Sequence, residues 1–430
     1  MRRGSLLILG NGGAAISAAF SARASGYEGA IHLVSDFEGP AFNPVLAPYF
    51  LKGLIPWERC FPFGPGFYDS HDIKCHLGAA VESLDAVGRE VVLADGRRLA
   101  YDKCLVATGA SPVIPPVPGL AGSRRAFILR TADSAKRLNE VIRSAGRILV
   151  LGASFVGLKV AEVLVKRGIR VTLLDVASQV LPRSANPESA AMIQKLFETH
   201  GVDVRLGCAM DGMEGVDEGV VCHFSNHVIE EADLVMVCTG VRPNIDFVDR
   251  ALVRIDQAIL VDEHMETNVP GLYASGDASQ GINLLTGRHE WLGTWENARL
   301  QGRIAGANMA GKDSRYPGST PQNIGPFFDW TYAQLGNVHP DGGSVTPRIF
   351  GNPTKGGHLA LYFQEDVLVG ANLINCSRLA GILRKAIIQR KPWAKSLERS
   401  PTVEGIERAL WRASDDLRGP ALKRLFVLPA

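Results

Sequence analysis

Two stretches of the chain have glycines at the spacing of a turn that binds the phosphates of a nucleotide. The first is Gly10, Gly12 and Gly13 with Ala15 at the place of a third glycine; the second is Gly152 and Gly157 with Ser154 at the middle place. Glycine lets the backbone turn tightly and approach a pyrophosphate, and the first turn of a following helix supplies unpaired N–H groups. Each stretch is therefore predicted to bind a dinucleotide, the second with an altered geometry because serine carries a side chain.

An acid follows each glycine stretch at the distance of a residue that binds ribose. These acids are Asp36 and Asp175. A carboxylate accepts hydrogen bonds from ribose hydroxyls, and it repels the 2′-phosphate that distinguishes NADPH from NADH. The residue after Asp175 is Val176 rather than an arginine, so the second site is predicted to prefer NADH.

The elements that must position these residues occur twice in the same order: apolar strand, glycine turn, small-residue helix, apolar strand and acid. The first copy runs through residues 6–9, 15–24 and 30–34, and the second through 148–151, 158–167 and 170–174. Continuous apolar runs of this length are typical of parallel strands buried on both faces. The alternative is one nucleotide site and one coincidental glycine turn, but the repetition favours two α/β dinucleotide-binding units.

Composition excludes several other classes of protein. The 430 residues are 46% hydrophobic and 21% charged, which is unlike a disordered, collagen-like or coiled-coil chain and predicts two or three domains. A net charge of +2 gives no overall attraction to nucleic acid or to an anionic membrane. Neither a nucleic acid partner nor membrane association is expected.

The cysteines and the N-terminus bear on location. The seven cysteines are odd in number and form no C-x-x-C pair, so neither a disulfide framework nor a metal site is expected, and a reducing, cytoplasmic location is favoured. The start Met1-Arg2-Arg3 followed by the apolar run 6–9 imitates a secretory signal. Gly10 interrupts that run after a few residues, which favours a buried strand.

Further motifs give the chain a resemblance to a known family, the pyridine nucleotide–disulfide oxidoreductases. Besides the two glycine loops, the motifs are Ala107-Thr108-Gly109, the segment 238–244 with Gly240, and Leu272-Tyr273-Ala274-Ser275-Gly276-Asp277. The closer likeness is to the ferredoxin-reductase and NADH-oxidase-like members, which lack a redox disulfide. The resemblance covers the chain to about residue 390.

The resemblance implies an α/β fold with two Rossmann-like three-layer dinucleotide-binding domains and an α+β C-terminal interface domain. We expect a discontinuous FAD-binding domain at 1–120 and 246–323, an NAD-binding domain at 121–245, and an interface domain with a basic helical tail at 324–430. The residues implied to bind FAD are Gly10, Gly12, Gly13, Ala15, Asp36, Asn43, Thr108, Gly109, Arg130, Gly276 and Asp277. Those implied to bind NAD are Gly152, Ser154, Gly157, Asp175 and Gly240.

Two of these expectations have alternatives. Arg130 and the following Thr131 resemble a family position near FAD, but they equally fit the start of a helix that Thr131 and Asp133 would cap. Lys159 stands where the family often has a glutamate. It is predicted to pair with Glu162, to lie near the nicotinamide, or to be an ordinary lysine of a helix surface.

The chain also departs from the family in its thiols and in one lysine. The family's disulfide reductases carry two cysteines in the first helix, and peroxidase relatives carry one after an Asn near position 43. Here the first cysteine is Cys60, and Pro44 follows Asn43. Cys60 and Cys75 are predicted to be small buried residues, so a thiol–disulfide mechanism is not expected. Ferredoxin-reductase relatives have a lysine near the reactive flavin nitrogen where this chain has Pro48.

The C-terminal part adds aromatic residues and a basic tail. The aromatic stretch 324–330 resembles one that approaches the flavin in the family, and a helix is predicted at 297–310. From Arg384 onward there are 11 Lys/Arg and 5 Asp/Glu, with apolar residues that include Ile406, Leu410, Trp411 and Leu417. The tail is predicted to be a docking surface for a redox partner or sister subunit; a solvated helix and a membrane-surface helix are the alternatives.

Together these features predict an FAD-dependent oxidoreductase that uses NADH. The flavin would pass single electrons to an iron–sulfur protein, either a free carrier or a subunit of a larger complex such as a tungsten aldehyde oxidoreductase. The alternatives are a self-contained NADH oxidase or quinone reductase, and an apoptosis-inducing-factor-like interaction protein whose flavin acts as a redox-sensitive ligand. Oligomer or complex formation is expected to use the C-terminal domain.

Overall fold

A computed structural model describes residues 4–64, 66–339, 345–390, 392 and 402–414 of the chain. Packing divides the chain into two compact units. The first comprises Met1–Ser178 and Phe197–Ser319, and the second comprises Gln179–Leu196 and Thr320–Ala430.

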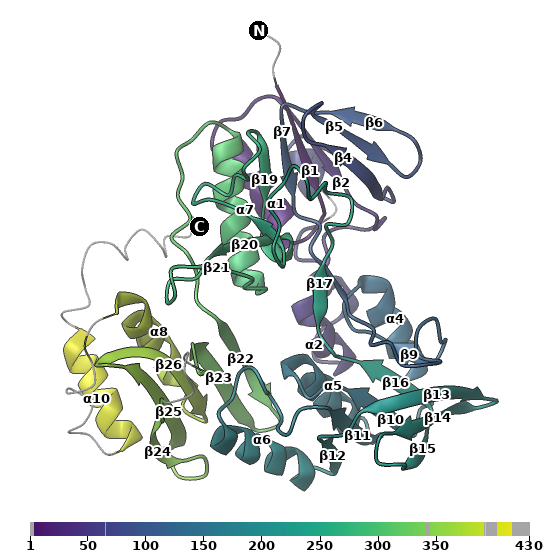
Figure 1. The fold of residues 1–430 in the computed structure, drawn as a ribbon, viewed down its shortest axis with the longest axis vertical. Coiled ribbons are helices and arrows are strands. Elements are labelled where there is room, and N and C mark those ends of the chain that lie inside the picture. Colours follow the sequence, from purple (N-terminus) through teal and green to yellow (C-terminus); the bar gives the residue numbers. More distant parts are fainter. Residues whose placement is uncertain (1–3, 65, 340–344, 391, 393–401, 415–430) are drawn as a thin grey trace. The chain divides into compact units, whose positions relative to one another are not determined.

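The first unit contains a five-stranded parallel sheet built around the first glycine stretch. Its order is β19-β7-β1-β2-β3, with β1 at Ser5–Leu9, β2 at Ala30–Val34, β3 at Ile73–His76, β7 at Lys103–Val106 and β19 at Leu272–Ala274. The apolar run 6–9 is buried in the central strand, so the prediction of a strand there is confirmed. Helices α1 (Gly13–Ala24) and α7 (Trp295–Met309) pack along each other beside this sheet (Figure 1). The predicted helix 297–310 is α7.

A second parallel sheet repeats this arrangement. Its order is β12-β11-β10-β16-β9, with β9 at Ala126–Phe127, β10 at Arg147–Leu151, β11 at Arg170–Asp175, β12 at Val202–Leu206 and β16 at Leu234–Val237. Helix α5 (Phe155–Lys166) follows β10, as α1 follows β1, and α4 (Ala132–Val141) precedes β10. The predicted repeat of strand, turn, helix and strand is confirmed in both copies.

Short elements complete the first unit. Two antiparallel sheets contain β4 (Val81–Asp85), β5 (Glu90–Leu93) and β6 (Arg98–Ala100), and β13 (Met210–Val216), β14 (Gly219–Phe224) and β15 (Ile229–Ala232). A further small sheet contains β18 (Ile259–Leu260), β20 (Ser279–Ile282) and β21 (His289–Glu290), and the short helices are α2 (Ala47–Leu51) and α3 (Phe67–Ser70). Strands β8 (Ala110–Pro112) and β17 (Val241–Pro243) pair antiparallel where the chain passes from the first parallel sheet to the second and back.

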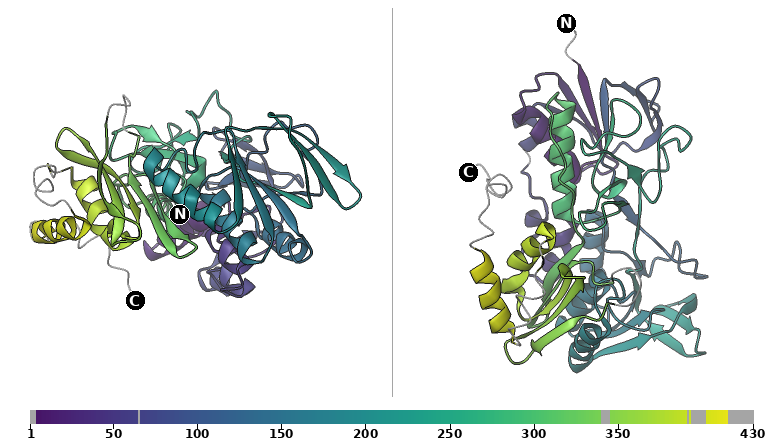
Figure 2. Two further views of the ribbon diagram at one scale, coloured as in Figure 1. Left: turned by 90° about the horizontal axis from the view of Figure 1, so that it is seen from below. Right: turned by 60° about the vertical axis from the view of Figure 1, so that its left-hand side comes forward.

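The second unit is an antiparallel sheet with helices. The sheet order is β22-β23-β26-β25-β24, with β22 at Gln322–Phe327, β23 at Trp330–Gly336, β24 at Arg348–Asn352, β25 at Gly357–Gln364 and β26 at Val367–Ile374. Helices α8 (Ala380–Gln389) and α10 (Val403–Ser414), yellow in Figure 2, pack on the sheet and on each other. The segment that leads into α6 (Pro187–Thr199) contacts the sheet through buried hydrogen bonds, among them Asn372 Nδ2 to Ser184 O at 2.8 Å.

The basic tail is only partly described. Ile406 and Leu410 of α10 are fully buried within the second unit. These two residues therefore pack inside the unit and are not available to a partner or a membrane, whereas the prediction that the tail is a docking surface stays a prediction. Leu417 and the residues after it lie outside the described part of the chain, as does the side chain of Trp411. None of the described helices is long and apolar enough to span a bilayer.

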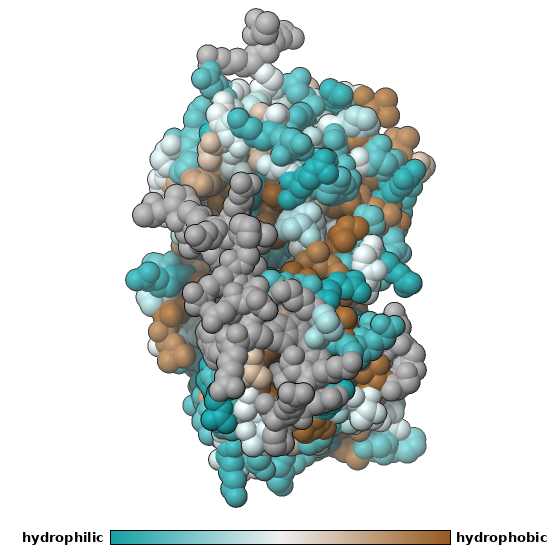
Figure 3. Space-filling view, turned by 90° about the vertical axis from the view of Figure 1, so that its left-hand side faces the viewer, coloured by the Kyte–Doolittle hydropathy of each residue, from teal (hydrophilic) through white to brown (hydrophobic). Residues whose placement is uncertain are grey.

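The fold class predicted from the sequence is confirmed, whereas the boundaries at 120, 245 and 323 stay predictions. On the face drawn in Figure 3, hydrophobic side chains lie in separate patches among hydrophilic ones. The large apolar side chains that are most exposed lie in turns: Leu54, Val87 and Val176.

Candidate functional site

The first glycine stretch forms a tight turn into α1. Gly10 has φ 120°, a conformation that side-chain-bearing residues rarely adopt. A Cβ at Gly13 would lie 3.0 Å from the ring of Trp295, so glycine is also required for the approach of α7. Gly12 is the N-cap residue and offers no side chain to the first-turn amides of α1, while Ala15 is fully buried in the core. The turn therefore leaves helix N–H groups for an anionic ligand.

The second stretch forms a similar turn, but one of its own side chains caps the helix that follows. Gly152 has φ 103° and packs against the backbone of Cys238. Ser154 is the N-cap of α5: its hydroxyl accepts from Gly157 N at 3.3 Å and donates to Cys238 O at 3.1 Å. The serine that departs from the glycine pattern is thus the N-cap of helix α5.

The two acids stand at the carboxyl ends of β2 and β11, where ligands of parallel sheets bind. Asp36 is exposed. The Asp175 carboxylate accepts from Ala153 N at 2.6 Å and from Ala177 N at 2.8 Å, which fixes its orientation beside the second glycine turn. Val176 is 74% exposed next to it. This arrangement suits a ribose with a free 2′-hydroxyl and supplies no cation at that position for a phosphate.

Arg130 and Asp277 come from distant parts of the chain and meet in an ion pair. Arg130 Nη2 lies 2.5 Å from Asp277 Oδ2, and Arg130 Nε donates to Ala110 O at 3.1 Å. Asp277 follows Gly276, which has φ 67° at the end of β19. The helix-start interpretation of this segment is confirmed, since Thr131 caps α4; its capping partner is Ser134 rather than Asp133. The position of Arg130 near FAD stays a prediction.

Thr108 and Gly240 lie in the two turns that leave the parallel sheets. Thr108 Oγ1 donates to Asn244 O at 2.5 Å, and Asn244 Nδ2 donates back to Thr108 O at 3.1 Å. Gly109 and Gly240 have positive φ of 72° and 113°. The hydrogen bonds between Thr108 and Asn244 thus join the two segments by which the chain passes between the parallel sheets.

Asn43 is buried and engaged locally. Its side-chain oxygen accepts from Val45 N at 3.0 Å and caps the 3-10 turn Pro44–Leu46, and its N–H donates to Cys60 O at 2.8 Å. Its role toward FAD stays a prediction, as do those of the other residues implied by the family.

The thiols near the first glycine turn are not poised as nucleophiles. Cys60 is fully buried, as predicted, and burial raises its pKa. The prediction that Cys75 is buried is wrong: it is half-buried in β3, at the edge of the sheet, and it lines a cavity of about 520 Å³. Desolvation nevertheless raises the pKa of Cys75 to about 11, so the thiol is protonated at neutral pH.

Lys159 is buried rather than on a helix surface, so that interpretation is wrong. Its Nζ lies 3.2 Å from Glu162 Oε2, which confirms the predicted pairing. The sequence did not reveal that Lys52, at the end of α2, joins the same carboxylate at 2.8 Å. No local pattern could have indicated this contact, because it depends on how α2 packs against α5.

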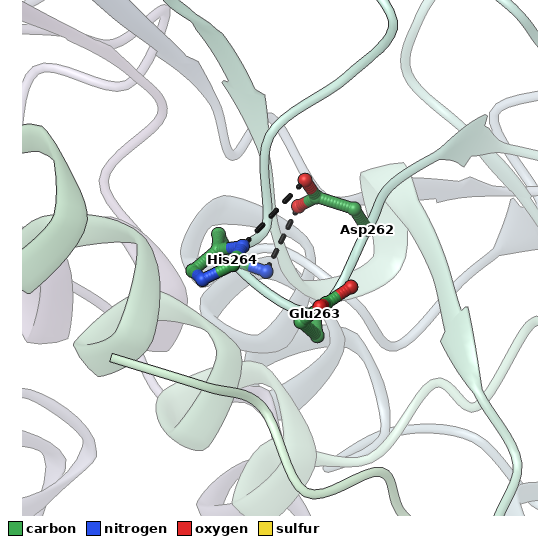
Figure 4. A group of neighbouring side chains, drawn as sticks. All are labelled: Asp262, Glu263 and His264. Carbon is green, nitrogen blue, oxygen red and sulfur yellow. Dashed lines mark hydrogen bonds and ion pairs between the residues drawn. The ribbon is translucent and has the colours of Figure 1, made fainter. Parts of the chain in front are cut away.

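One group of potential metal ligands lies among the described residues, at Asp262, Glu263 and His264 (Figure 4). The Asp262 carboxylate accepts from His264 N at 2.8 Å, and His264 Nε2 lies 2.9 Å from Asp313 Oδ1. Glu263 pairs with Arg315. Asp262 and Glu263 are exposed, His264 is half-buried, and all three have partners within the protein, so we assign no metal to this turn.

Comparison with known proteins decides the family. A model of the pyridine nucleotide-disulphide oxidoreductase family matches residues 4–302. This chain belongs to that family. It is 33% identical over 390 residues to the NADH-dependent phenylglyoxylate dehydrogenase subunit epsilon of Aromatoleum evansii, which covers 89% of this chain and 91% of that protein.

Two further matches concern putidaredoxin reductase. The Pseudomonas putida protein is 33% identical over 318 residues, 72% of this chain and 75% of its own length. The crystal structure of the covalent putidaredoxin reductase–putidaredoxin complex matches with a TM-score of 0.87 and 28% identity, over 95% of this chain and 99% of that chain.

The protein is thus an FAD-dependent NADH oxidoreductase with a confirmed two-cofactor fold. The geometry fits both cofactors: the first glycine turn leaves helix amides for a phosphate, and the second is flanked by an oriented carboxylate. When bound, the flavin supplies the exchange between two-electron and one-electron chemistry. The residues of this chain bind the two cofactors and orient them toward each other.

Proposed function

We propose that this protein moves electrons from NADH to an iron–sulfur protein that is a partner subunit of a larger NADH-linked enzyme. The overall balance is one NADH and two oxidised one-electron acceptors giving NAD⁺, one proton and two reduced acceptors. The observation that carries the proposal is the state of the thiols. All seven cysteines are free, and six of them are buried. Since no disulfide stands between the flavin and the acceptor, we infer that the flavin passes its electrons directly to an acceptor outside this chain.

The relatives support the kind of acceptor. Putidaredoxin reductase is solved in a covalent complex with putidaredoxin, which supports a protein acceptor for this chain. The match to a protein named as a subunit of an NADH-dependent dehydrogenase covers nearly the full length of both chains, which supports a permanent complex. A tungsten aldehyde oxidoreductase is one such enzyme and stays a proposal.

The test is anaerobic purification of the protein from its native host, with analysis of iron and acid-labile sulfide. We expect an iron–sulfur subunit in fixed ratio to the chain. The isolated recombinant chain should reduce ferricyanide, a one-electron acceptor, with NADH, and should react at least tenfold more slowly with oxygen or a quinone. Rapid turnover with oxygen or quinone and an iron-free native protein would instead establish the self-contained oxidase or quinone reductase.

A further inference from the structure

A cluster of buried polar side chains in the second unit holds the backbone that leads into α6. Tyr332 on β23 and Asn372 on the adjacent strand β26 are both 0% exposed. Ser184 O accepts from the Tyr332 hydroxyl and from Asn372 Nδ2, the latter at 2.8 Å. Asn186 N donates to Asn372 Oδ1 at 3.2 Å. The C-terminal sheet therefore fixes both a carbonyl and an N–H group of the segment before α6.

The chain between Asp175 and this anchor has one strained residue. Residues 176–183 join Asp175 to Ser184, and among them Leu181 has φ 52°, a left-handed conformation that leucine rarely adopts. The Leu181 side chain is 1% exposed, and Ser184 N donates to Leu181 O at 2.9 Å. A residue persists in such a conformation only where the surrounding structure holds it. The stretch 176–183 therefore has a reason to change its conformation when its anchor at Ser184 is lost.

The other end of the stretch lies at the acid beside the second glycine turn. Ala177 N donates to Asp175 Oδ1 at 2.8 Å, and Gly207 N donates to Ala177 O at 2.8 Å. Val176, between them, is 74% exposed. The carboxyl end of this strand is where the ribose of a dinucleotide binds in such folds. A coenzyme bound at Asp175 therefore meets the first residues of a stretch whose far end is held in the second unit.

We propose that Asn372 and Tyr332 are positioning residues for the coenzyme: they hold the stretch 176–183 in the conformation that binds NADH. They act through the chain that ends at Ser184. When a binding conformation is only partly populated, the apparent dissociation constant rises by the inverse of that population. Loss of the anchor therefore weakens NADH binding and leaves the subsequent chemistry intact. The inference rests on NADH binding at Asp175 and is independent of which acceptor takes the electrons.

The sheet itself offers a matched control for Asn372. Gln334 lies directly opposite Asn372 in the register of β23 and β26, and it is 3% exposed. Its side chain accepts from Asn323 Nδ2 at 3.0 Å and donates to Gly336 O at 2.5 Å, so its hydrogen bonds stay within the sheet. Asn372→Leu removes the contacts to the stretch, whereas Gln334→Leu removes equally buried contacts elsewhere. The pair separates anchoring from the general cost of losing a buried amide.

The first readout is anaerobic reduction of the FAD-loaded full chain by NADH, followed by stopped flow without any acceptor. Its dependence on NADH concentration gives the dissociation constant of NADH and the limiting rate of reduction. We expect Asn372→Leu to raise the dissociation constant about tenfold, because two buried backbone groups lose their partners, and to leave the limiting rate within twofold. Gln334→Leu should leave both quantities within twofold of wild type.

The second readout reports the stretch itself and needs no activity. Arg183 is exposed and offers trypsin a cleavage site directly before Ser184. Cleavage of a folded chain requires local opening, and its rate follows the population of the open form when closing is fast. We expect cleavage after Arg183, identified by mass spectrometry, to be several-fold faster in Asn372→Leu than in wild type or Gln334→Leu. Saturating NAD⁺ should slow it in every variant, since the bound coenzyme favours the anchored conformation.

A second pair of variants serves if Asn372→Leu does not fold. Tyr332→Phe removes the hydroxyl that donates to Ser184 O, and Tyr362→Phe removes a buried hydroxyl that donates to Asn372 Oδ1 at 3.3 Å. We expect a dissociation constant about threefold higher in Tyr332→Phe, because one of the two donors to Ser184 remains, and an unchanged one in Tyr362→Phe.

Three outcomes overturn the proposal. The first is a dissociation constant within twofold of wild type in Asn372→Leu, or an unchanged one in Tyr332→Phe where the former does not fold. The second is an equal rise in the matched control, and the third is cleavage after Arg183 that is no faster in the anchor variant. Neither readout uses an electron acceptor, so failure here and failure of the proposed function are distinguishable.

Discussion

The close packing of α1 against α7 predicts that a side chain added between the two helices will destabilise the first glycine turn. Gly302 and Gly306 lie one turn apart on α7 and face the backbone of α1. A Cβ at Gly302 would lie 2.1 Å from the carbonyl oxygen of Ala14, and one at Gly306 would lie 2.0 Å from that of Ala18. Because backbone cannot move aside as a rotamer can, Gly302→Ala must push the helices apart by about 1 Å, which sacrifices a quarter to half of each facing dispersion contact.

The magnitude follows from two opposing effects. Overpacking costs about 1–3 kcal/mol, and this contact with backbone belongs at the upper end, whereas replacing an interior helix glycine by alanine gains about 1 kcal/mol. We therefore expect a net loss of about 2 kcal/mol, or a fall in Tm of roughly 4–8 °C. Since α1 begins at the first glycine turn, the variant should also release flavin more readily. Scanning calorimetry and flavin fluorescence after dilution measure the two effects.

The matched control is Gly381→Ala on α8. A Cβ there meets nothing within 4 Å, and the residue is exposed, so the same substitution should leave Tm unchanged or raise it slightly. If Gly302→Ala were as stable as Gly381→Ala and kept its flavin, the close crossing of α1 and α7 would not be the feature that holds the first turn.

Three further predictions concern the coenzyme, pH and thiol reactivity. Replacing both Asp175 and Val176, as Asp175→Ala with Val176→Arg, should move the ratio of kcat/KM for NADPH over NADH upward by at least about tenfold, because the carboxylate that repels the 2′-phosphate is exchanged for a cation. His32 and His76 share a 3.0 Å contact, and burial lowers the pKa of both. The unfolded chain thus takes up more protons than the folded one as pH falls below about 6.5. The free energy of unfolding, measured by urea titration, should therefore decrease from pH 6.5 towards pH 5. The decrease should be smaller in the His76→Gln variant. Cys75, with its pKa raised to about 11, should react slowly with iodoacetamide at pH 7 and about tenfold faster per pH unit above it; a plateau near pH 8 would contradict the raised pKa of this half-buried thiol.

The parts of the fold that could be predicted are those with local signals. A buried parallel strand needs a continuous apolar run, and a turn at positive φ needs glycine, so both copies of the repeat can be recognised from short windows such as Leu6–Leu9 and Gly10. The β25–β26 hairpin is marked in the same way by its apolar runs.

The parts that could not be predicted are contacts between elements. Arg130 reaches Asp277 across 147 positions, and Lys52 reaches Glu162 only because α2 packs on α5. Residues 179–196 pack with the C-terminal sheet, where the buried Asn372 side chain binds Ser184 O. Such pairings depend on tertiary packing, and polar side chains that are surface residues in most helices become buried partners here.

The two copies of the repeat differ in the residue that caps the helix after the glycine turn. In α1 the N-cap is Gly12, which offers its first-turn amides no side-chain acceptor, so this helix end is satisfied best by a phosphate that stays bound. In α5 the Ser154 hydroxyl accepts from Gly157 N. This N–H group of the first turn therefore has a hydrogen-bond partner even when no ligand is bound. A Ser/Thr cap contributes about 1 kcal/mol, which an arriving phosphate must displace or share. That difference suits a cofactor retained through many turnovers at the first turn and a coenzyme exchanged in each turnover at the second, which is the division of labour that transfer of electrons from NADH through FAD requires.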